Sequence, residues 1–292
     1  MKQKVISPVL KNVAIVYRRK SQGAQKETIK LVSWLQEKGI NVYLEDNKLK
    51  LAKTRVFTSK NLSHLDLMIV LGGDGTYLYA TSIVKDKNIP LLGINWGSLG
   101  FLTETPAEQM YNVLDLALLG KLNYQSRSLL KVLVKKKRGK SSSYLALNDI
   151  VFERGPYSRL IRFQMYSNKD FVNESRADGI IISTPTGSTA YNLAAGGPIL
   201  HPETQAIVFT PICPHSLTQR PLVLPETHKI CIKIESPTQK ANFMVDGQKV
   251  EILSPSDELH IEIAKVRHTL VSPSNSSYYE LLRKKLHYGK RE

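Results

Sequence analysis

The sequence predicts an α/β domain followed by a β-rich domain. In the first part of the chain, short apolar runs of the buried-strand type alternate with stretches of helical periodicity, the pattern of a parallel sheet covered by helices. Beyond Lys121 helical stripes become rare, and short β-type runs separated by turn residues dominate. A last stretch, 277–286, again has apolar residues at helical spacing. We therefore expect an α/β domain at 1–122, a β-rich domain at 123–272 and a C-terminal helix within 273–292 that packs back on the first domain.

Each element of the first domain has its own signal. Apolar runs predict buried strands at 12–17, 40–44, 66–71 and 89–94. Helical stripes predict helices at 25–38, where Gly39 supplies a stop, and at 76–84. The sequence TPAE at 105–108 has the pattern of a capping box with proline at the first helical position, so a third helix is expected to begin there.

The second domain is predicted from shorter signals. Its β-type runs lie at 129–134, 144–152, 160–166, 179–183, 207–211, 229–235 and 259–265. Six basic residues crowd the segment 131–140, beside Gly139 and the serines 141–143. This composition indicates an exposed hairpin loop whose lysines are solvated.

Composition narrows the class of protein. A chain of 292 residues with 42% hydrophobic and 23% charged residues is typical of a globular protein of two domains. No apolar run approaches the ~20 residues of a membrane span, and the N-terminal stretch is too interrupted for a signal peptide, so we expect a cytoplasmic protein with no membrane partner. Cys213 and Cys231 match no CxxC or zinc pattern and are expected to be reduced thiols, and the scattered histidines suggest no metal site. The net charge of +16 favours anionic partners: phosphorylated metabolites, nucleic acid or acidic lipid.

The most informative stretch is 66–77, DLMIVLGGDGTY. Its buried strand ends in three glycines that surround Asp74. Glycines let the backbone turn sharply and approach a ligand, and a helix that begins after such a turn presents free N–H groups to phosphate. We therefore predict a phosphate loop made of Gly72, Gly73, Gly75 and Thr76. A carboxylate there would repel phosphate unless it holds Mg²⁺ or accepts a proton; the alternative is a tight turn with a solvated aspartate.

A second informative stretch is 178–198, DGIIISTPTGSTAYNLAAGGP. An apolar strand leads into a run of hydroxyl residues with a proline and a glycine, which opens a helix of small residues. Hydroxyl groups at a helix N-terminus suit a ribose, an adenine edge or a phosphate. A capped turn with close packing would explain the glycines, but not so many hydroxyl groups beside Tyr191. Two shorter pieces, Asn148-Asp149 and VDGQ at 245–248, are weak signals on their own.

Two other nucleotide-binding motifs are excluded because each lacks one required glycine. Val134 stands where the first glycine of a P-loop ending at 139–141 belongs, and Leu78 stands where the third glycine of GxGxxG belongs. The sequence has no HExxH, GxSxG or HRD signature.

Taken together, the motifs resemble the NAD kinase family, in particular its bacterial members. The resemblance covers nearly the whole chain and is carried by GGDGT at 72–76, LGFLTE at 99–104, LND at 147–149, RADG at 176–179, STPTGSTAYNLAAGGP at 183–198, RPLVL at 220–224, VDGQ at 245–248 and YYELLRKKLH at 278–287. GGDG also resembles loops of diacylglycerol kinases and 6-phosphofructokinases, whereas the stretch 183–198 is highly specific. The family's usual Asn-Glu pair is Asn148-Asp149 here, one methylene shorter.

The resemblance implies an activity and a set of roles. It implies transfer of the γ-phosphoryl group of ATP, with Mg²⁺ or another divalent cation, to the adenosine 2′-hydroxyl of NAD, in a site between the domains of a homodimer or homotetramer. It makes Asp74 the catalytic carboxylate. The residues implied to bind or neighbour NAD are Asp74, Gly75, Phe101, Asn148, Asp149, Arg176, Asp178, Thr186, Thr189, Ala190, Tyr191, Asn192, Leu193, Ala194, Asp246 and Gln248.

Two other functions stay open on the sequence. A lipid or sphingoid kinase could share the GGDG loop, although no basic amphipathic helix suited to a membrane surface is found. A nucleic-acid-binding protein could use the cluster 131–140, although no aromatic residues interleave with its lysines.

Overall fold

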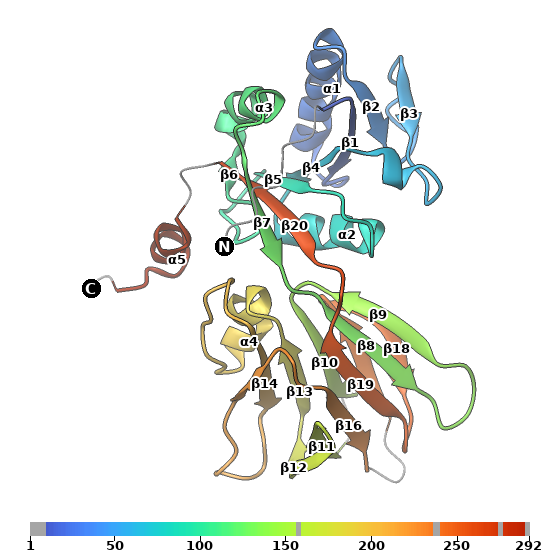
Figure 1. Cartoon of the computed structure of the whole chain (residues 1–292), viewed down its shortest axis with the longest axis vertical. Helices are drawn as coiled ribbons and strands as arrows, with labels where there is room; N and C mark the ends of the chain where they lie inside the picture. Colours follow the sequence, from blue (N-terminus) through green and yellow to red (C-terminus); the bar gives the residue numbers. More distant parts are fainter. Residues whose placement is uncertain (1–9, 156–158, 236–239, 274–276, 290–292) are drawn as a thin grey trace. The chain divides into compact units, whose positions relative to one another are not determined.

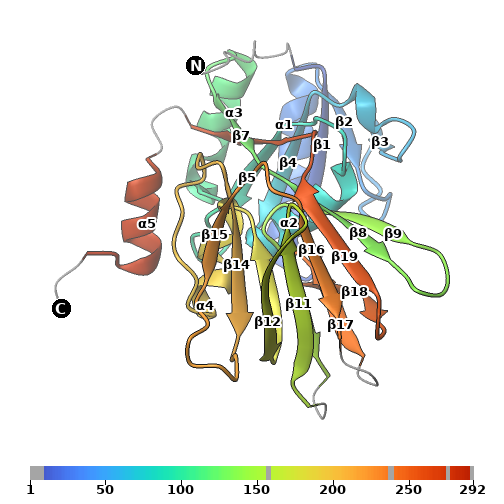
Figure 2. The same cartoon turned by 60° about the horizontal axis from the view of Figure 1, so that its bottom comes forward.

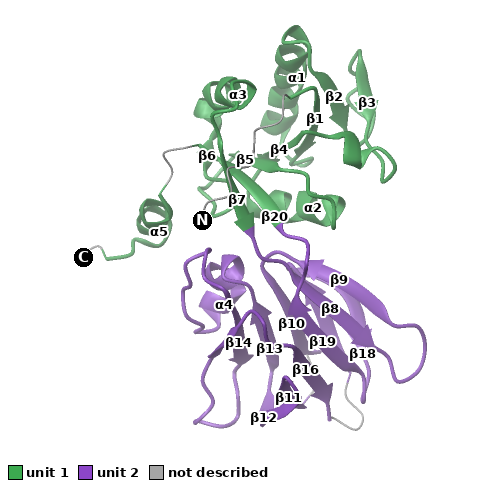
Figure 3. Ribbon diagram, viewed as in Figure 1, with its two compact units in different colours: residues 1–126, 268–292 green, residues 127–267 purple. Residues whose placement is uncertain are grey.

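The chain forms two units (Figure 3). Unit 1 comprises residues 1–126 and 268–292, and unit 2 comprises residues 127–267. The computed structural model describes residues 10–155, 159–235, 240–273 and 277–289. Unit 1 is discontinuous in sequence, because the chain leaves it before unit 2 and returns to it afterwards.

Unit 1 is the predicted α/β structure. Its strands are β1 (Asn12–Tyr17), β2 (Asn41–Leu44), β3 (Thr54–Val56), β4 (Leu67–Gly72), β5 (Leu91–Asn95), β6 (Thr105–Pro106), β7 (Asn123–Arg127) and β20 (His268–Ser272). Its helices are α1 (Gln22–Glu37), α2 (Asp74–Val84), α3 (Met110–Leu118) and α5 (Tyr278–Leu286), with 3₁₀ turns at Leu62–His64 and Ala107–Gln109. The sheet has the order β3-β2-β1-β4-β5-β20-β7, and β6 also pairs with β5.

Helices cover both faces of this sheet (Figure 1). The pairs formed by β1 with β2, β1 with β4 and β4 with β5 are parallel, as predicted. Figure 1 shows α1 and α3 on one side of the sheet and α2 on the other. Leu31, Val32 and Leu35 of α1 are buried in one apolar cluster with residues of α3 and the strands. β4 is buried along its whole length, as expected for a central parallel strand, and it delivers Gly72 to the point where α2 begins.

The boundaries of the units differ from the predicted ones. The sequence pattern predicts residues 123–126 and 268–272 as part of the β-rich domain, whereas they lie in β7 and β20 of the unit 1 sheet. β20 pairs in parallel with β5, Leu270 opposite Leu91 and Val271 opposite Leu92. A pairing between strands so distant in sequence leaves no local signal.

The capping box predicted at 105–108 is wrong. Thr105 and Pro106 form β6 against Ile94 and Asn95 of β5, and Pro106 is extended with ψ 148°. Pairing with β5 therefore wins over the local helix-start pattern, and α3 begins only at Met110 after a 3₁₀ turn.

The predicted C-terminal helix is α5, and it belongs to unit 1. Leu281 and Leu282 are its buried residues. The Lys285 ammonium donates a hydrogen bond to the carbonyl oxygen of Leu99, in the loop after β5. Residues 274–276 and 290–292 of the predicted C-terminal segment lie outside the described residues.

Unit 2 is the predicted β-rich part and contains two antiparallel sheets. One has the order β15 (Leu222–Pro225), β14 (Ala206–Ile212), β13 (Gly179–Ser183), β10 (Asp149–Arg154), β17 (Ala241–Val245), β18 (Gln248–Leu253). The other has the order β12 (Asp170–Ala177), β11 (Ile161–Ser167), β16 (Ile230–Ile234), β19 (Glu258–Ile263), β8 (Leu130–Lys135), β9 (Ser142–Ala146). A 3₁₀ turn at Thr186–Thr189 and the short helix α4 (Tyr191–Ala194) follow β13. Residues of both sheets share one apolar core, so unit 2 is a β-sandwich.

The β-run predicted at 144–152 is two strands rather than one. It breaks at Leu147 and Asn148, because β9 belongs to one sheet and β10 to the other. The chain therefore crosses between the sheets at residues 147–149, which we call the 147–149 corner.

The basic cluster lies on a hairpin, as predicted, but one of its lysines is not solvated. β8 and β9 pair as a hairpin (Figure 2). The Lys136 ammonium lies 2.6 Å from Glu251 and 3.3 Å from Asp257, whose side chain is 3% exposed, and it also donates to the carbonyl oxygen of Ile252. Lys136 therefore ties the loop to the segment 251–257 rather than pointing into water.

Across the described ranges, no helix has the length and the apolar character that a membrane span needs.

Replacing Lys136 tests its contacts with the segment 251–257. Lys136→Met keeps the aliphatic stem but leaves the nearly buried Asp257 carboxylate without its cation, so the free energy of unfolding in urea should fall by about 1–3 kcal/mol. The matched control, Lys135→Ser with Lys137→Ser, removes two exposed charges and should change it by less than about 0.5 kcal/mol. Equal losses in both proteins would contradict a structural role for Lys136.

Candidate functional site

The predicted phosphate loop is the junction between β4 and α2. α2 begins at Asp74, two residues earlier than the sequence suggested, and Gly73 precedes it without a capping side chain. The first N–H groups of a helix have no partner within the helix. In α2 the Thr76 N–H already donates to the Gly73 carbonyl oxygen at 2.9 Å, so the N–H groups of Asp74 and Gly75 are the ones that can attract an anion, together with the helix dipole.

The glycines of the loop differ in what they are for. A Cβ on Gly72 would lie 2.3 Å from the Thr76 hydroxyl oxygen, so Gly72 is needed for packing within the chain. A Cβ on Gly73 or Gly75 would meet nothing within 4 Å, and neither residue has a positive φ. Nothing in the chain itself requires glycine at these two positions, and the open space beside them is the kind that a ligand occupies.

Asp74 does not point freely into this loop. Its Oδ1 accepts hydrogen bonds from the N–H groups of Leu102 (3.0 Å) and Thr103 (3.1 Å) and from the Thr103 hydroxyl (3.1 Å). Its Oδ2 accepts one, from the Phe101 N–H at 2.8 Å. A Cβ on Gly100 would lie 2.0 Å from Oδ1, so glycine there lets the loop close on the carboxylate. Oδ2 is the oxygen with room for a further partner.

Unit 2 holds its predicted residues around the 147–149 corner. The Asp246 carboxylate accepts hydrogen bonds from the N–H groups of Leu147 (2.9 Å), Asn148 (2.7 Å) and Asp149 (3.2 Å). The Asp246 N–H in turn donates to the Asp149 carbonyl oxygen at 2.9 Å. Asp246 therefore positions Asn148 and Asp149, and its own oxygens are occupied in doing so.

The carbonyl groups of the corner are also fixed. Thr184 donates its N–H to the Asn148 carbonyl oxygen at 2.9 Å and its hydroxyl to that of Leu147 at 2.6 Å. The same hydroxyl accepts the Gly187 N–H at 3.0 Å. A Cβ on Gly187 would lie 2.1 Å from the Asn148 carbonyl oxygen, so the 3₁₀ turn lies directly against the corner.

Two side-chain oxygens at this junction have no internal partner. Asn148 Oδ1 and Thr186 Oγ1 are buried and make no hydrogen bond to any of the described residues. An unpaired buried acceptor costs about 1–3 kcal/mol. Asn148 and Thr186 both belong to the motifs singled out above, and a ligand that supplies donors would satisfy both oxygens.

Asp149 adds a buried acid to the same junction. The residue is 4% exposed. Burial, and after it the negative charge of Asp246, raises the pKa of Asp149 to about 7. Burial also raises the pKa of Asp246 to about 6, although its three backbone hydrogen bonds oppose the shift. Near neutral pH Asp149 is therefore divided between a protonated form and an ionised form.

The segment after β13 brings further predicted residues near Asp149. The pKa of Tyr191 is raised by burial and then by the neighbouring groups Glu153, Cys213, Asp149 and Asp178. Asp178 forms an ion pair with Arg154, a residue that the sequence reasoning missed. Thr189, Ala190, Leu193 and Ala194 lie in the same turn and helix.

The side chain of Asn192 is engaged inside unit 2, and its contact with NAD stays a prediction. It is completely buried, and its amide donates to the carbonyl oxygens of Ser188 (3.0 Å) and Pro198 (3.1 Å). Its Oδ1 accepts the Thr210 hydroxyl at 2.7 Å. These bonds hold α4 against β14 and leave the amide no hydrogen for a ligand.

The remaining predicted residues lie apart from these contacts. Arg176 is exposed on β12, and Gln248 is exposed at the start of β18, next to the Asp246-Gly247 turn. Phe101 contributes its N–H to Asp74. Thr103 and Thr184 were missed because a single threonine in a loop or strand carries no signal until its partner is known.

Alanine substitutions at Gly75 and at Gly72 test whether the open space of the loop is a phosphate site. Gly75→Ala should keep or raise the melting temperature, since alanine is better than glycine in a helix by about 0.5–1 kcal/mol, but it should weaken ATP binding by filling the open space. Gly72→Ala should lower the melting temperature, because its Cβ would collide with Thr76. Thermal unfolding and the KM for ATP measure the two effects. If Gly75→Ala left the KM unchanged, the open space would not be a phosphate site.

Comparison with known proteins places both units in one family. Residues 13–122 match the ATP-NAD kinase N-terminal domain, and residues 147–272 match the ATP-NAD kinase C-terminal domain. The NAD kinase of Bdellovibrio bacteriovorus is 42% identical over 281 residues, which cover 96% of this chain and 93% of that protein. The NAD kinase of Geobacter sulfurreducens is 36% identical over 284 residues, which cover 97% and 100%.

Solved structures agree with the sequence relatives. Yeast NADH kinase complexed with NADH has a TM-score of 0.90 and 27% identity, covering 98% of this chain and 90% of that one. The NAD kinase of Archaeoglobus fulgidus in complex with ATP has a TM-score of 0.74 and 25% identity, covering 94% and 97%. Since both family domains are present in order and the similarity to named members runs along nearly the whole chain, this protein belongs to the NAD kinase family.

Proposed function

We propose that this chain is an enzyme that transfers the γ-phosphoryl group of ATP to the adenosine 2′-hydroxyl of NAD, giving NADP and ADP. The observation that carries the proposal is a pair of buried, unpaired oxygens, Asn148 Oδ1 in the 147–149 corner and Thr186 Oγ1 in the 3₁₀ turn that lies against it, together with the buried acid Asp149. The hydroxyl and amino groups of an adenosine are donors that fit such acceptors. The relatives described above give no support to a lipid kinase or a nucleic-acid-binding protein.

The proposed NAD contacts come from both units. Asn148 and Thr186 are proposed because each has a buried oxygen without a partner among the described residues, and Asp149 is proposed because it is a buried acid next to Asn148. Asp246 and Asn192 are assigned positioning roles. The other proposed contacts are Gly75, Phe101, Arg176, Asp178, Thr189, Ala190, Tyr191, Leu193, Ala194 and Gln248.

The β4–α2 junction is proposed to hold the phosphates of ATP. The N–H groups at the start of α2 and the open space at Gly73 and Gly75 suit a phosphate oxygen approaching the backbone. Transfer of a phosphoryl group requires mainly positioning and neutralisation of charge, and this junction provides both without any covalent step on the protein.

Mg²⁺ is proposed as the cofactor and fits a loop with so few protein oxygens. It keeps several waters and binds through one or two carboxylates together with substrate phosphates. Among the described residues, no group of three or more His, Cys, Asp or Glu side chains surrounds Asp74. A cation carried mainly by the phosphates of ATP suits this arrangement, and when bound it would neutralise their charge.

Asp74 is proposed to receive the proton of the attacking hydroxyl. Its Oδ1 already accepts three hydrogen bonds, so Oδ2 is the atom assigned to this role. As the 2′-oxygen bonds to the γ-phosphorus, the bond from that phosphorus to the bridging oxygen of ADP breaks, and the hydroxyl proton passes to Oδ2. Because aspartate is a weak base, this proton moves late, when the attacking oxygen has become acidic.

Both cysteines are free thiols, which suits a reducing compartment and hence the cytoplasm. A homodimer or homotetramer is proposed from the family resemblance alone.

The activity and the role of Asp74 are tested together. The purified protein with Mg²⁺, ATP and NAD should form NADP, detected with an NADP-specific dehydrogenase. Asp74→Asn should lower kcat by about 10²-fold or more, the scale for loss of a general base. Absence of NADP formation by the parent would overturn the proposed function, and near-normal kcat in Asp74→Asn would overturn the catalytic role.

A second variant separates chemistry from loop positioning. An asparagine amide at position 74 also faces the backbone N–H groups of 101–103 and would disturb that loop. Thr103→Val removes one of the hydrogen bonds to Asp74 and leaves the carboxylate in place, so kcat should stay within about tenfold of the parent. If Thr103→Val were as inactive as Asp74→Asn, Asp74 would act by holding the loop.

The buried acid predicts a pH-dependent affinity for NAD. Ribose hydroxyl groups donate more strongly to an ionised carboxylate, so the KM for NAD should fall as the pH rises through the pKa of about 7 of Asp149. Asp149→Asn cannot ionise and should lose this dependence between about pH 6 and pH 8.

Removing the Asp149 side chain measures how much it contributes to NAD binding. Asp149→Ala should raise the KM for NAD by roughly 5- to 150-fold, equivalent to about 1–3 kcal/mol, with little change in the KM for ATP. Asp149→Glu restores the family's usual residue and should keep part of the activity. A parent-like KM for NAD in Asp149→Ala would remove Asp149, and with it Asn148, from the proposed NAD site.

A further inference from the structure

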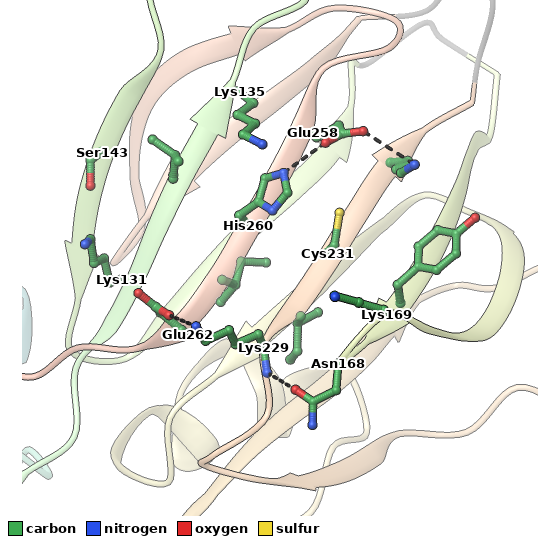
Figure 4. A pocket seen from close by; sticks show the side chains of 15 residues that line it. Lys131, Lys135, Ser143, Asn168, Lys169, Lys229, Cys231, Glu258, His260 and Glu262 are labelled. Carbon is green, nitrogen blue, oxygen red and sulfur yellow. Dashed lines mark hydrogen bonds and ion pairs between the residues drawn. The ribbon is translucent and has the colours of Figure 1, made fainter.

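The outward face of the sheet β12-β11-β16-β19-β8-β9 carries a hollow of about 960 Å³ that the proposed function does not use (Figure 4). Figure 4 shows Cys231, Glu258 and His260 in it. Lysines surround them, namely Lys131, Lys135, Lys169, Lys229 and Lys233.

Strand alternation explains why these three side chains share one face. In β16 the buried residues alternate with Cys231 and Lys233, and in β19 buried residues alternate with Glu258 and His260. In the antiparallel pair, Cys231 lies directly opposite His260, and Lys233 lies opposite Glu258. Directly opposite and diagonal residues of neighbouring strands are within reach of one another.

The geometry brings a sulfur, a nitrogen and an oxygen together. One ligand atom from each of Cys231, Glu258 and His260 lies within 4.8 Å of the other two. Among the described residues, this is the one group of three or more potential metal ligands found within such distances. None of the three is fully exposed, so the group is partly shielded from solvent.

A neighbouring lysine holds the carboxylate in place. Glu258 Oε2 lies 2.9 Å from His260 Nε2, while Oε1 lies 3.5 Å from the Lys233 ammonium. That ammonium also lies 5.2 Å from the centre of the Tyr166 ring. Lys233 therefore occupies one oxygen of Glu258 and leaves the other directed at His260, which is how supporting contacts orient metal ligands.

We propose that Cys231, Glu258 and His260 bind a zinc ion, with water in the fourth position. Thiolate, imidazole and carboxylate are the three protein ligands that zinc takes, in four-coordinate sites. Mg²⁺ and Ca²⁺ prefer oxygen ligands alone, so a set with sulfur and nitrogen disfavours them. The thiolate and the carboxylate together neutralise a dication, which makes a cation acceptable on a face lined with lysines.

Binding has a defined proton balance. Burial, with Glu258 as the second cause, raises the pKa of the Cys231 thiol, while Lys233 and Lys135 act in the opposite direction. Cys231 therefore carries its proton in the free protein, and zinc displaces one proton from it into solvent. In the free protein His260 Nε2 donates its hydrogen to Glu258 Oε2. Zinc takes the place of that hydrogen, and the neutral imidazole then carries its proton on Nδ1.

The site would connect two strands in the middle of the sheet. β16 and β19 are neighbours between β11 and β8, and a metal bound across them stabilises the folded state over the unfolded one. The expected consequence is a rise in the melting temperature with zinc, with no need for a change in NADP formation.

Zinc binding is tested on the full chain without a purification tag, after removal of metals with a chelator. A titration against a fluorescent zinc indicator should show one tight site per chain, and zinc should raise the melting temperature. Cobalt should bind the same site and give thiolate-to-cobalt charge-transfer absorption. Cys231→Ser, His260→Ala and Glu258→Gln should each weaken zinc binding by at least about 10–100-fold, and Cys231→Ser should abolish the charge-transfer band.

Matched controls come from the same chain. Cys213→Ser removes the other thiol, and Glu262→Gln removes the next outward carboxylate of β19; both should bind zinc as the parent does. NADP formation and the melting temperature without metal report whether each variant is folded.

Three results would overturn the proposal. The parent could bind no zinc at micromolar concentration, Cys231→Ser could bind zinc as tightly as the parent, or the cobalt complex could lack the thiolate band. Because the three ligand variants lie on two strands, failure of one to fold leaves the other two to decide.

Discussion

The carboxylate of Asp246 is the constraint on which the unit 2 site depends. Where the chain crosses from one sheet to the other, three successive N–H groups at 147–149 leave the regular ladders, and an unpaired buried N–H costs about 1–3 kcal/mol. Asp246 accepts all three. It can do so because it occupies a two-residue hairpin turn with Gly247, in which both residues have positive φ, +48° and +73°, values that aspartate and glycine tolerate. Turn chemistry thus determines where Asn148 and Asp149 lie.

Unit 1 solves a similar problem with Asp74. Its carboxylate accepts the N–H groups of three successive residues, 101–103, in the loop after β5. The two aspartates differ in their surroundings and in the hydrogen bonds of their carboxylate oxygens. Asp246 lies in a turn beside Asp149, and burial raises the pKa of both carboxyl groups. Asp74 stands at the N-terminus of α2, where the helix dipole favours an anion, and it retains one oxygen with a single hydrogen bond.

Features that depend on residues close in sequence could be predicted. The apolar run before the glycines predicted β4, and the same motif indicated the phosphate loop. Features that depend on distant partners could not be predicted: β20 beside β5, the solvation of Lys136, and the donors that surround Asp74. The pair Cys231 and His260 is the clearest case, since the spacing rules for metal ligands apply to residues close in sequence, whereas an antiparallel register joins residues from separate strands. The roles of Arg176 and Gln248 rest on resemblance, because nothing internal constrains an exposed side chain.

The placement of β20 has a consequence for how the protein is made. The β5 residues Leu91 and Leu92 pair with a strand that follows all of unit 2, so the unit 1 sheet cannot be completed while the ribosome is still synthesising residues 127–267. At about 5–20 residues per second this leaves an apolar strand edge open for on the order of 10 s. An open edge is a template for pairing with other chains. Unit 2, which is continuous in sequence, can complete its own sheets during that interval, whereas unit 1 must either wait or be shielded. Chain connectivity thus sets the order of folding: unit 1 is the first to be synthesised, but its sheet is completed only when β20 leaves the ribosome.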